Sequence, residues 1–226
     1  MRKAKFTCAL ILAALAVLIY YAHASDLPKH FLFDEEDSLT EWQEKIFKNR
    51  VLYTVEPAQK LKHLSAKSQE ACSGLFYRIN FDAKKFPMIS WYWKVRKFPE
   101  KDTVSEDKGG WIEKDDYAAR VYVIFPRLHF TKTKSIEYIW HQTLPKETIM
   151  TSPYFRNIKL IVVESGRENM DRWVFEERNI YEDYKKAFDK VPSSKVGAIA
   201  LMTDTDNTLS TAEALYKDIK VGYKNE

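Results

Sequence analysis

The clearest structural signal in the chain is the run Tyr117-Ala-Ala-Arg-Val-Tyr-Val-Ile-Phe125. Successive side chains of an extended strand point to opposite faces, so the run predicts a strand with two different faces. The two faces carry, respectively, Ala119, Val121, Val123 and Phe125, and Arg120, Tyr122 and Ile124. One face is therefore wholly apolar, and the other places a single charge among apolar neighbours.

Similar patterns recur on both sides of this run. We expect strands at residues 30–33, 51–55, 74–81, 89–95, 136–140, 158–165, 173–179, 196–203 and 215–223. Residues 158–165 are more continuously apolar than the other runs, which is typical of a strand buried on both faces. Helical signals are confined to residues 181–188 and 41–48, and to a capping-box pattern at Ser210-Thr-Ala-Glu213. Because few helices separate the strands, we expect largely antiparallel sheets stacked face to face.

The N-terminus has the composition of a secretory signal peptide. Three basic residues, Arg2, Lys3 and Lys5, precede an apolar run at residues 6–21, and Ala22-His-Ala24 then places small residues where a signal peptidase cuts. An uncleaved membrane anchor is the alternative, but the apolar run is short for a span of about 20 residues. We therefore expect a signal peptide at residues 1–24 and a single domain at residues 25–226, located in the periplasm or secreted.

Cleavage would change the charge of the chain. The predicted signal peptide holds three basic and no acidic residues, so its removal lowers the formal net charge from +4 to +1. A nearly neutral domain argues against a nucleic-acid binder, which needs a clustered basic surface. It also argues against attraction to a membrane surface, and we expect no stable membrane insertion after cleavage.

Several motifs together resemble a bacterial family of exported proteins whose function is unknown. They are Trp91-Tyr-Trp93-Lys-Val95, Asp116-Tyr-Ala-Ala-Arg120-Val-Tyr-Val, Tyr138-Ile-Trp140, Ser165-Gly166, Trp173 with Glu177-Arg178-Asn179, Asp183-Tyr184, and Met202-Thr-Asp204-Thr-Asp206-Asn207-Thr208. The resemblance extends from about Phe33 to Lys220, and its opening segment looks like the first strands of a galactose-binding-like jelly roll. It implies an all-β, jelly-roll-like antiparallel β-sandwich with one or two short helices, related in shape to carbohydrate-binding modules. Asp189 and Lys217 stand where this family pattern leads us to expect glycine.

Charged and aromatic residues within strands are the candidates for a ligand site. A sugar presents apolar faces to Trp and Tyr rings and hydroxyls to polar groups. The fork of an arginine side chain holds a carboxylate or a phosphate. The candidate ligand-binding residues are Arg120, Tyr138, Trp140, Arg178, Glu177 and Asp116. Core packing of the aromatics, and internal ion pairs such as Arg120 with Asp116 or Glu177, are the structural alternatives.

A separate oxygen-rich motif lies at Asp204-Thr-Asp206-Asn207. Asp204, Asp206 and Asn207 are the types of ligand that a hard cation such as Ca²⁺ takes, so a structural calcium ion is one interpretation. The EF-hand pattern is absent, and these residues are also ordinary turn formers. No other cofactor is indicated.

The motifs of common enzyme classes are missing, including G-x-S-x-G, H-E-x-x-H and a phosphate-binding glycine loop. We therefore expect an exported, non-catalytic module that binds a saccharide or another small polar ligand on one face of the sandwich. One alternative is a carbohydrate-active enzyme that uses a carboxylate pair drawn from Glu164, Glu176, Glu177 and Asp183. A second is a protein–protein interaction domain of the envelope.

Overall fold

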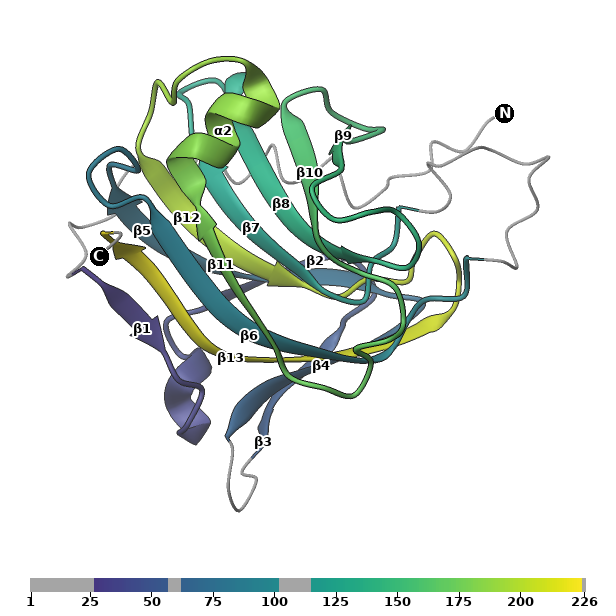
Figure 1. Cartoon of the computed structure of the whole chain (residues 1–226). Coiled ribbons are helices and arrows are strands. Elements are labelled where there is room, and N and C mark those ends of the chain that lie inside the picture. The colour runs from purple at the N-terminus through teal and green to yellow at the C-terminus, as the bar shows by residue number, and fades with distance from the viewer. Residues whose placement is uncertain (1–26, 57–61, 102–114, 225–226) are drawn as a thin grey trace.

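The computed structural model describes residues 27–56, 62–101 and 115–224. Within these residues the chain forms a two-layered β-sandwich with one α-helix (Figure 1). The expected all-β, jelly-roll-like class is confirmed. The expected signal peptide at residues 1–24 lies outside the described residues.

The first layer is a six-stranded sheet with the order β11-β6-β13-β4-β3, and β1 pairs with β13 beside this path. All of its pairings are antiparallel. Its strands are β1 (Lys29–Phe31), β3 (Leu52–Glu56), β4 (His63–Gln69), β6 (Met88–Lys97), β11 (Val174–Asn179) and β13 (Thr211–Tyr223).

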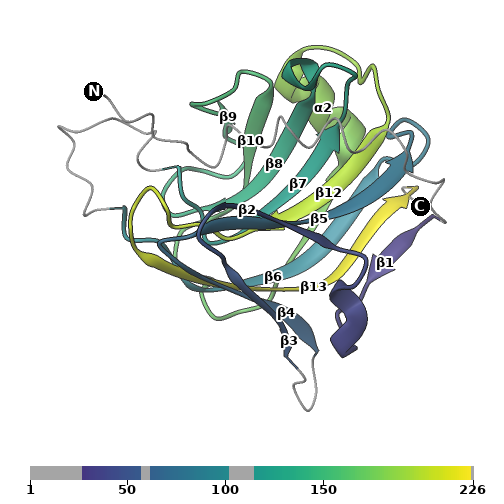
Figure 2. The same ribbon diagram turned by 180° about the vertical axis from the view of Figure 1, so that it is seen from behind.

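The second layer is a seven-stranded sheet with the order β2-β5-β12-β7-β8-β10-β9, seen from behind in Figure 2. Its strands are β2 (Gln43–Lys48), β5 (Cys72–Phe81), β7 (Arg120–Phe125), β8 (Lys134–His141), β9 (Ile149–Thr151), β10 (Ile158–Ser165) and β12 (Val196–Met202). The pairings are antiparallel except that β8 and β10 run parallel. The segment between them, which contains β9, makes the crossover that a parallel pair requires.

Alternation along β7 separates two apolar clusters. Val121, Val123 and Phe125 belong to the main core between the sheets, whereas Tyr122 and Ile124 belong to a second cluster. Because neighbouring side chains point to opposite faces, the second cluster lies on the outer face of the seven-stranded sheet. Strands β10 and β12 contribute to both clusters, which explains why apolar residues occupy both of their faces.

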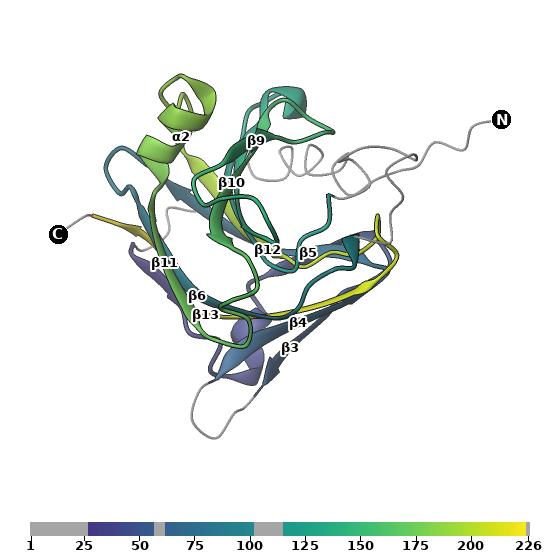
Figure 3. The same ribbon diagram turned by 45° about the vertical axis from the view of Figure 1, so that its right-hand side comes forward.

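Helix α2 (Ile180–Phe188) confirms the helix expected at residues 181–188. It connects β11 of one sheet to β12 of the other and lies at one end of the sandwich (Figures 1 and 3). The side chain of Asn179 caps its first turn by accepting a hydrogen bond from the backbone N–H of Glu182 at 3.0 Å. Ile180 and Tyr184 bury the inward face of the helix in the main core.

The helix suggested at residues 41–48 is wrong. Residues 43–48 form β2, and the nearby helical turn is a 3₁₀-helix, η3 (Glu36–Leu39). The capping-box pattern at Ser210 precedes β13 rather than a helix. In both places the cross-strand partners in the sheet override a weak local preference. A second 3₁₀-helix, η7 (Phe130–Lys132), connects β7 to β8.

Asp189, where glycine was expected, has a φ of 52°. It ends α2 in the left-handed conformation, for which glycine is the usual choice because it has no Cβ. At the second expected glycine, the left-handed residue is Asp218, with a φ of 49°, next to Lys217. The register of β13 against β6 shifts at this point, between Lys217 and Lys220.

In the described part of the chain, no helix combines the length and apolar character needed to cross a membrane.

Candidate functional site

Arg120, at the start of β7, is the centre of a buried ion network. Its Nε donates to Asp204 Oδ1 at 3.0 Å and its Nη2 to Asp204 Oδ2 at 2.5 Å, which is a bidentate pair. Its Nη1 donates to Glu137 Oε2 at 3.1 Å, and its Nη2 also reaches the backbone oxygen of Asp115 at 2.6 Å. The side chains of Arg120, Asp204 and Glu137 are at most 5 % exposed. The network therefore joins β7 and β8 to the segment after β12, inside the protein.

Burial dominates the electrostatics of this network. It raises the pKa of Glu137 to about 7 and that of Asp115 to about 6, against the opposing effect of the Arg120 guanidinium. Desolvation disfavours the charged form of a carboxyl group, and the single cation Arg120 faces three of them, so it offsets this effect only in part. Such a cluster can hold a proton near neutral pH. Each of the three guanidinium nitrogens of Arg120 already donates to a partner within the protein.

Asp116 fixes the turn that follows β12. Its Oδ2 accepts hydrogen bonds from the backbone N–H of Thr208 at 2.6 Å and from the hydroxyl of Thr208 at 2.7 Å. The side-chain amide of Asn207 donates to Asp116 Oδ1 at 3.3 Å. Asp116 is fully buried, and its role here is to hold this turn.

Of the three residues expected to bind calcium, Asp204 and Asp206 come close together, but Asn207 does not join them. Asp204 faces Arg120, and Asn207 faces Asp116. Asp206 Oδ1 is buried and accepts no hydrogen bond from the described residues. The atoms that come closest to a ligand set are one oxygen each from Asp204 and Asp206 together with Cys72 Sγ, all within 4.8 Å of one another. Two carboxylate oxygens fall well short of the roughly six to eight oxygen ligands that Ca²⁺ takes, so this set does not match the expected chemistry.

Arg178 forms a second ion network at the other sheet. Its Nε and Nη2 donate to the two oxygens of Asp183 at 2.9 and 2.7 Å, and its Nη1 donates to Glu147 Oε1 at 2.5 Å. Asp183 Oδ2 also accepts the hydroxyl of Tyr138 at 2.9 Å. The network ties β11, α2, β8 and the segment before β9 together, and it neutralises Arg178 with two carboxylates.

The remaining candidates lie elsewhere. Trp140 is buried in the main core and donates its ring N–H to the backbone oxygen of Gly166 at 3.0 Å. Tyr138 packs in the same core. Glu177 is exposed and accepts the hydroxyl of Tyr223 at 2.8 Å. The six candidate residues are thus divided among two closed ion networks, a turn, the core and the surface, and they do not form one open binding face.

An open cavity of about 430 Å³ lies instead at the end of the sandwich beside α2. Phe125 and Tyr184 are buried and form its floor, with ring centroids 4.7 Å apart. Leu128, which is 71 % exposed, lies at its rim. Ser193 and Ser194, from the segment between α2 and β12, add hydroxyl groups.

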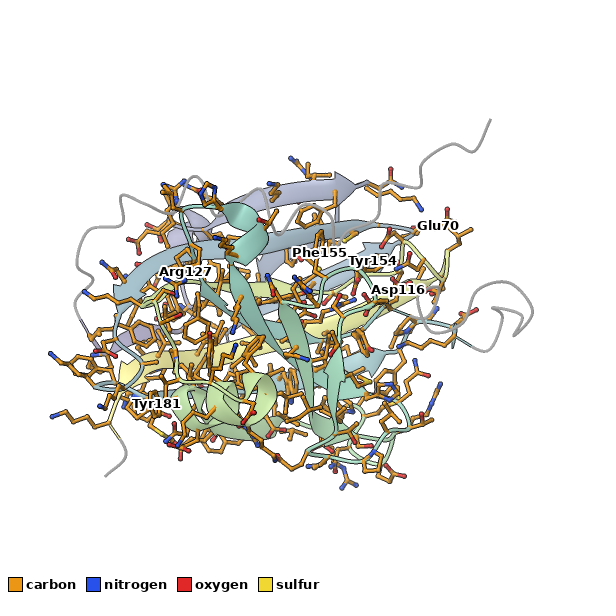
Figure 4. All side chains as sticks on the ribbon, turned by 90° about the horizontal axis from the view of Figure 1, so that it is seen from above. Glu70, Asp116, Arg127, Tyr154, Phe155 and Tyr181 are labelled. Carbon is orange, nitrogen blue, oxygen red and sulfur yellow. The ribbon has the colours of Figure 1, made fainter. Side chains whose placement is uncertain are left out.

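The ionisable side chains that surround the floor of this cavity are basic. Arg127, His129, Lys132 and Lys134 line it, and the described lining contains no acidic residue. Arg127 donates through Nη2 to the Ser193 hydroxyl. Figure 4 shows Arg127 at the opposite end of the seven-stranded sheet from Asp116. The cavity is therefore distinct from the Arg120 network, although β7 connects the two.

This cavity was missed at the sequence level, but a signal for it exists. Residues 127–134 place Arg127, His129, Lys132 and Lys134 between two strongly predicted strands. Short runs of this kind are usually solvated loops, so the run alone does not indicate a site. What the sequence does not show is that Tyr184 and Ser193, about 50 residues later, lie against it.

A second cavity of about 470 Å³ lies at the edge of the six-stranded sheet and includes Lys67 and Glu213 in its lining. Here the charges already pair: Lys67 Nζ lies 3.6 Å from Glu56 and 4.0 Å from Glu213. Arg96, near the same edge, contacts Glu213 at 2.9 Å. This second cavity presents fewer free polar groups than the first.

Two glutamates named as candidates for a catalytic pair do lie in one environment. Burial, with the nearby charge of Glu164 adding to it, raises the pKa of Glu176 to about 7. Glu164 is 2 % exposed at its side chain and pairs with Lys146 Nζ at 2.6 Å. A carboxyl group that keeps its proton beside one that is ion-paired is the arrangement that acid–base catalysis uses.

Several solved structures share a broad likeness with this chain. The family 30 carbohydrate-binding module of the cellulase Cel9D-Cel44B from Clostridium thermocellum has a TM-score of 0.44 and 8% identity, covering 82% of this chain and 93% of that chain. The CBM22-1 xylan-binding domain of Xyn10C from Paenibacillus barcinonensis has a TM-score of 0.39 and 12% identity, covering 91% and 100%.

The glycoside hydrolase domain of Spr0440, Endo-D, from Streptococcus pneumoniae R6 has a TM-score of 0.39 and 10% identity. That alignment covers 82% of this chain but only 22% of the hydrolase chain. At these TM-scores the likenesses carry no argument about function.

No curated protein matches the chain. One family model does, over residues 40–220, which is most of the sequence and includes both ion networks and the basic cavity. This agrees with the extent of the resemblance drawn from the motifs. The chain belongs to the family described as "Protein of unknown function (DUF3047)".

Proposed function

We propose that this protein is an exported, non-catalytic binding module whose ligand is a saccharide or another small polar molecule. The observation that carries the proposal is the cavity beside α2, whose polar side chains are not neutralised by carboxylates within the described residues. Ligand sites generally combine an apolar floor with a few convergent polar groups. The cavity has both, in the rings of Phe125 and Tyr184 and in the side chains of Arg127, Lys134 and Ser193.

The proposal moves the ligand away from Arg120, Tyr138, Trp140 and Arg178. Arg120, Tyr138 and Trp140 are buried, and Arg178 is partly buried and already paired with two carboxylates, so a ligand would have to break existing contacts to reach any of them. Removing one partner of a buried pair is costly, at about 3–5 kcal/mol. A preformed cavity avoids that cost.

A thermal-shift screen of the purified protein against a panel of neutral and acidic oligosaccharides tests this proposal. We expect at least one class to raise the melting temperature, because a ligand that binds only the folded state stabilises it. The matched control is a variant in which Ser194→Trp fills the cavity. If no saccharide stabilises the protein, or if stabilisation persists in the S194W variant, the proposal fails.

The second candidate function is glycoside cleavage by Glu176 and Glu164. It is favoured by the raised pKa of Glu176 beside the ion-paired Glu164. The Glu176→Gln variant separates it from simple binding, because it removes a general acid while keeping the shape of the side chain. Turnover of a chromogenic glycoside that is abolished in the variant would establish this activity, and absence of turnover by the unmodified protein would remove it.

A further inference from the structure

The charge of the cavity beside α2 is concentrated and unbalanced. Arg127, Lys132 and Lys134 lie within its lining, and Lys159 and Lys190 lie close enough to act electrostatically on Lys134. In the described part of the chain none of these five cations forms an ion pair with a carboxylate. Arg120 and Arg178 differ in this respect, because each is matched by at least two carboxylates of the protein itself.

Lys134 is the cation whose pKa shows the mutual repulsion of these charges. Partial burial lowers its pKa first, and the neighbouring charges of Lys190, Arg127 and Lys159 lower it further. Its described contacts are with the faces of the Tyr184 and Phe188 rings, 5.1 and 4.4 Å from Nζ to the ring centroids. Such contacts are weaker than an ion pair. A negatively charged group placed among these cations would relieve their mutual repulsion.

The geometry also offers directed donors and an apolar surface. The guanidinium of Arg127 is held beside the Ser193 hydroxyl, and a guanidinium fork matches the two oxygens of a carboxylate or the oxygens of a sulfate. Tyr184 and Phe125 supply a buried aromatic floor next to these donors. These two rings are at most 2 % exposed, so the apolar face of a sugar ring would pack on the exposed Leu128 at the rim, above them.

We propose that the cavity beside α2 binds an acidic saccharide, with the anionic substituent of the sugar between Arg127 and Lys134 and the sugar ring toward Leu128. This inference rests on the proposed function and names the class of its ligand. Neutral saccharides would leave the cations unmatched and would bind more weakly.

Isothermal titration calorimetry of the full chain tests the inference with four probes: an oligogalacturonate, a neutral galactose oligomer of equal length, inorganic sulfate and inorganic phosphate. The test variant R127Q/K134Q removes the two cations that would hold the anionic group. The single variant K132Q removes one other cation of the lining and leaves Arg127 and Lys134 in place. The control is K84Q/K85Q, which removes the same charge from the exposed turn between β5 and β6. Circular dichroism melts verify that each variant is folded.

We expect the oligogalacturonate to bind at least ten-fold more tightly than the neutral oligomer, with affinity falling as salt is raised. R127Q/K134Q should weaken it at least ten-fold, K132Q by a smaller factor, and K84Q/K85Q not at all. Equal binding of the neutral oligomer would overturn the acidic-ligand inference and leave the proposed function standing. Equal affinity for sulfate or phosphate would overturn the saccharide part, and binding of no probe would count against both proposals.

Discussion

Arg120 is a single residue on which three parts of the seven-stranded sheet depend. Its guanidinium contacts Asp204, Glu137 and the backbone of Asp115, all in the interior. Replacing it leaves at least two buried carboxyl groups without their cation, which is among the most destabilising changes a side chain can undergo.

We expect Arg120→Ala to lower the free energy of unfolding by about 3–5 kcal/mol. Arg96→Gln, which breaks an exposed pair with Glu213, should cost less than about 1 kcal/mol. Urea denaturation of the two variants measures the difference. A loss of under about 1 kcal/mol for Arg120→Ala would contradict the structural role given to this network.

The raised pKa of Glu176 has a consequence for stability. The pKa of Glu176 is about 7 in the folded protein and 4.5 for a glutamate without such interactions, as in the unfolded chain. Between these pH values the folded state therefore holds a proton that the unfolded chain has lost. Raising the pH through this window therefore lowers the free energy of unfolding.

We expect stability to fall as the pH rises from 4.5 to about 7, with Glu137 and Asp115 contributing to the same fall, and Glu176→Gln to make the fall shallower. The exposed neighbour Glu177→Gln is the matched control and should leave the slope unchanged. Denaturant titrations at a series of pH values measure the slope. An identical slope in the unmodified protein and the E176Q variant would show that Glu176 does not titrate in this window.

At the scale of elements, α2 is held by the Arg178 network as well as by its apolar face. Arg178 on β11 contacts Asp183 on the helix, which is buried and also accepts the hydroxyl of Tyr138 on β8. Because α2 forms one side of the cavity, its attachment also positions Tyr184 in the cavity floor.

We expect Arg178→Ala to lower the free energy of unfolding by about 1–3 kcal/mol, since it leaves a buried carboxylate with only a hydroxyl partner. Lys186→Gln removes an exposed cation from Glu147, a carboxylate that Arg178 also contacts, and should cost less than about 1 kcal/mol. Hydrogen exchange should show faster opening of α2 in the R178A variant. Unchanged exchange in α2 would mean that its apolar face alone holds it.

Strands were predictable from the sequence because alternation is a local signal. The run at residues 117–125 predicted a strand with two different faces, and the largely apolar β10 predicted a strand buried on both faces; the structure has both. The segment at residues 43–48 was not predictable, since pairing with β5, whose partner residues are 24 to 33 positions away, makes it a strand. Asp189 was marked correctly as a glycine-like position, because its left-handed backbone ends a predicted helix.

The site was less predictable than the fold. The sequence marked Arg120 and Arg178 as unusual, since a charge inside a strand needs a partner. It did not show whether that partner is a ligand or another residue of the protein. The structure places carboxylates of the protein itself around both arginines. The basic cavity depends on residues 127–134 meeting residues 184–194, which only the folded chain brings together.

At the scale of the whole molecule, export remains a prediction that concerns residues outside the described structure. We expect the protein recovered from the cell envelope or the medium to begin at Ser25, after cleavage behind Ala24. N-terminal sequencing of the recovered protein measures this. A chain that still begins at its first residues would indicate an uncleaved anchor instead.

The central claim is that the molecule binds its ligand in the cavity beside α2. The most direct test is a titration of the isotope-labelled protein with an oligogalacturonate, followed through the backbone amide shifts. We expect the largest changes in amide shift at the residues around the cavity floor, which are Arg127, Lys134, Ser193 and Ser194. Changes centred on Arg50, Leu52 and Lys67 at the second cavity, or no changes at any saccharide concentration, would contradict it.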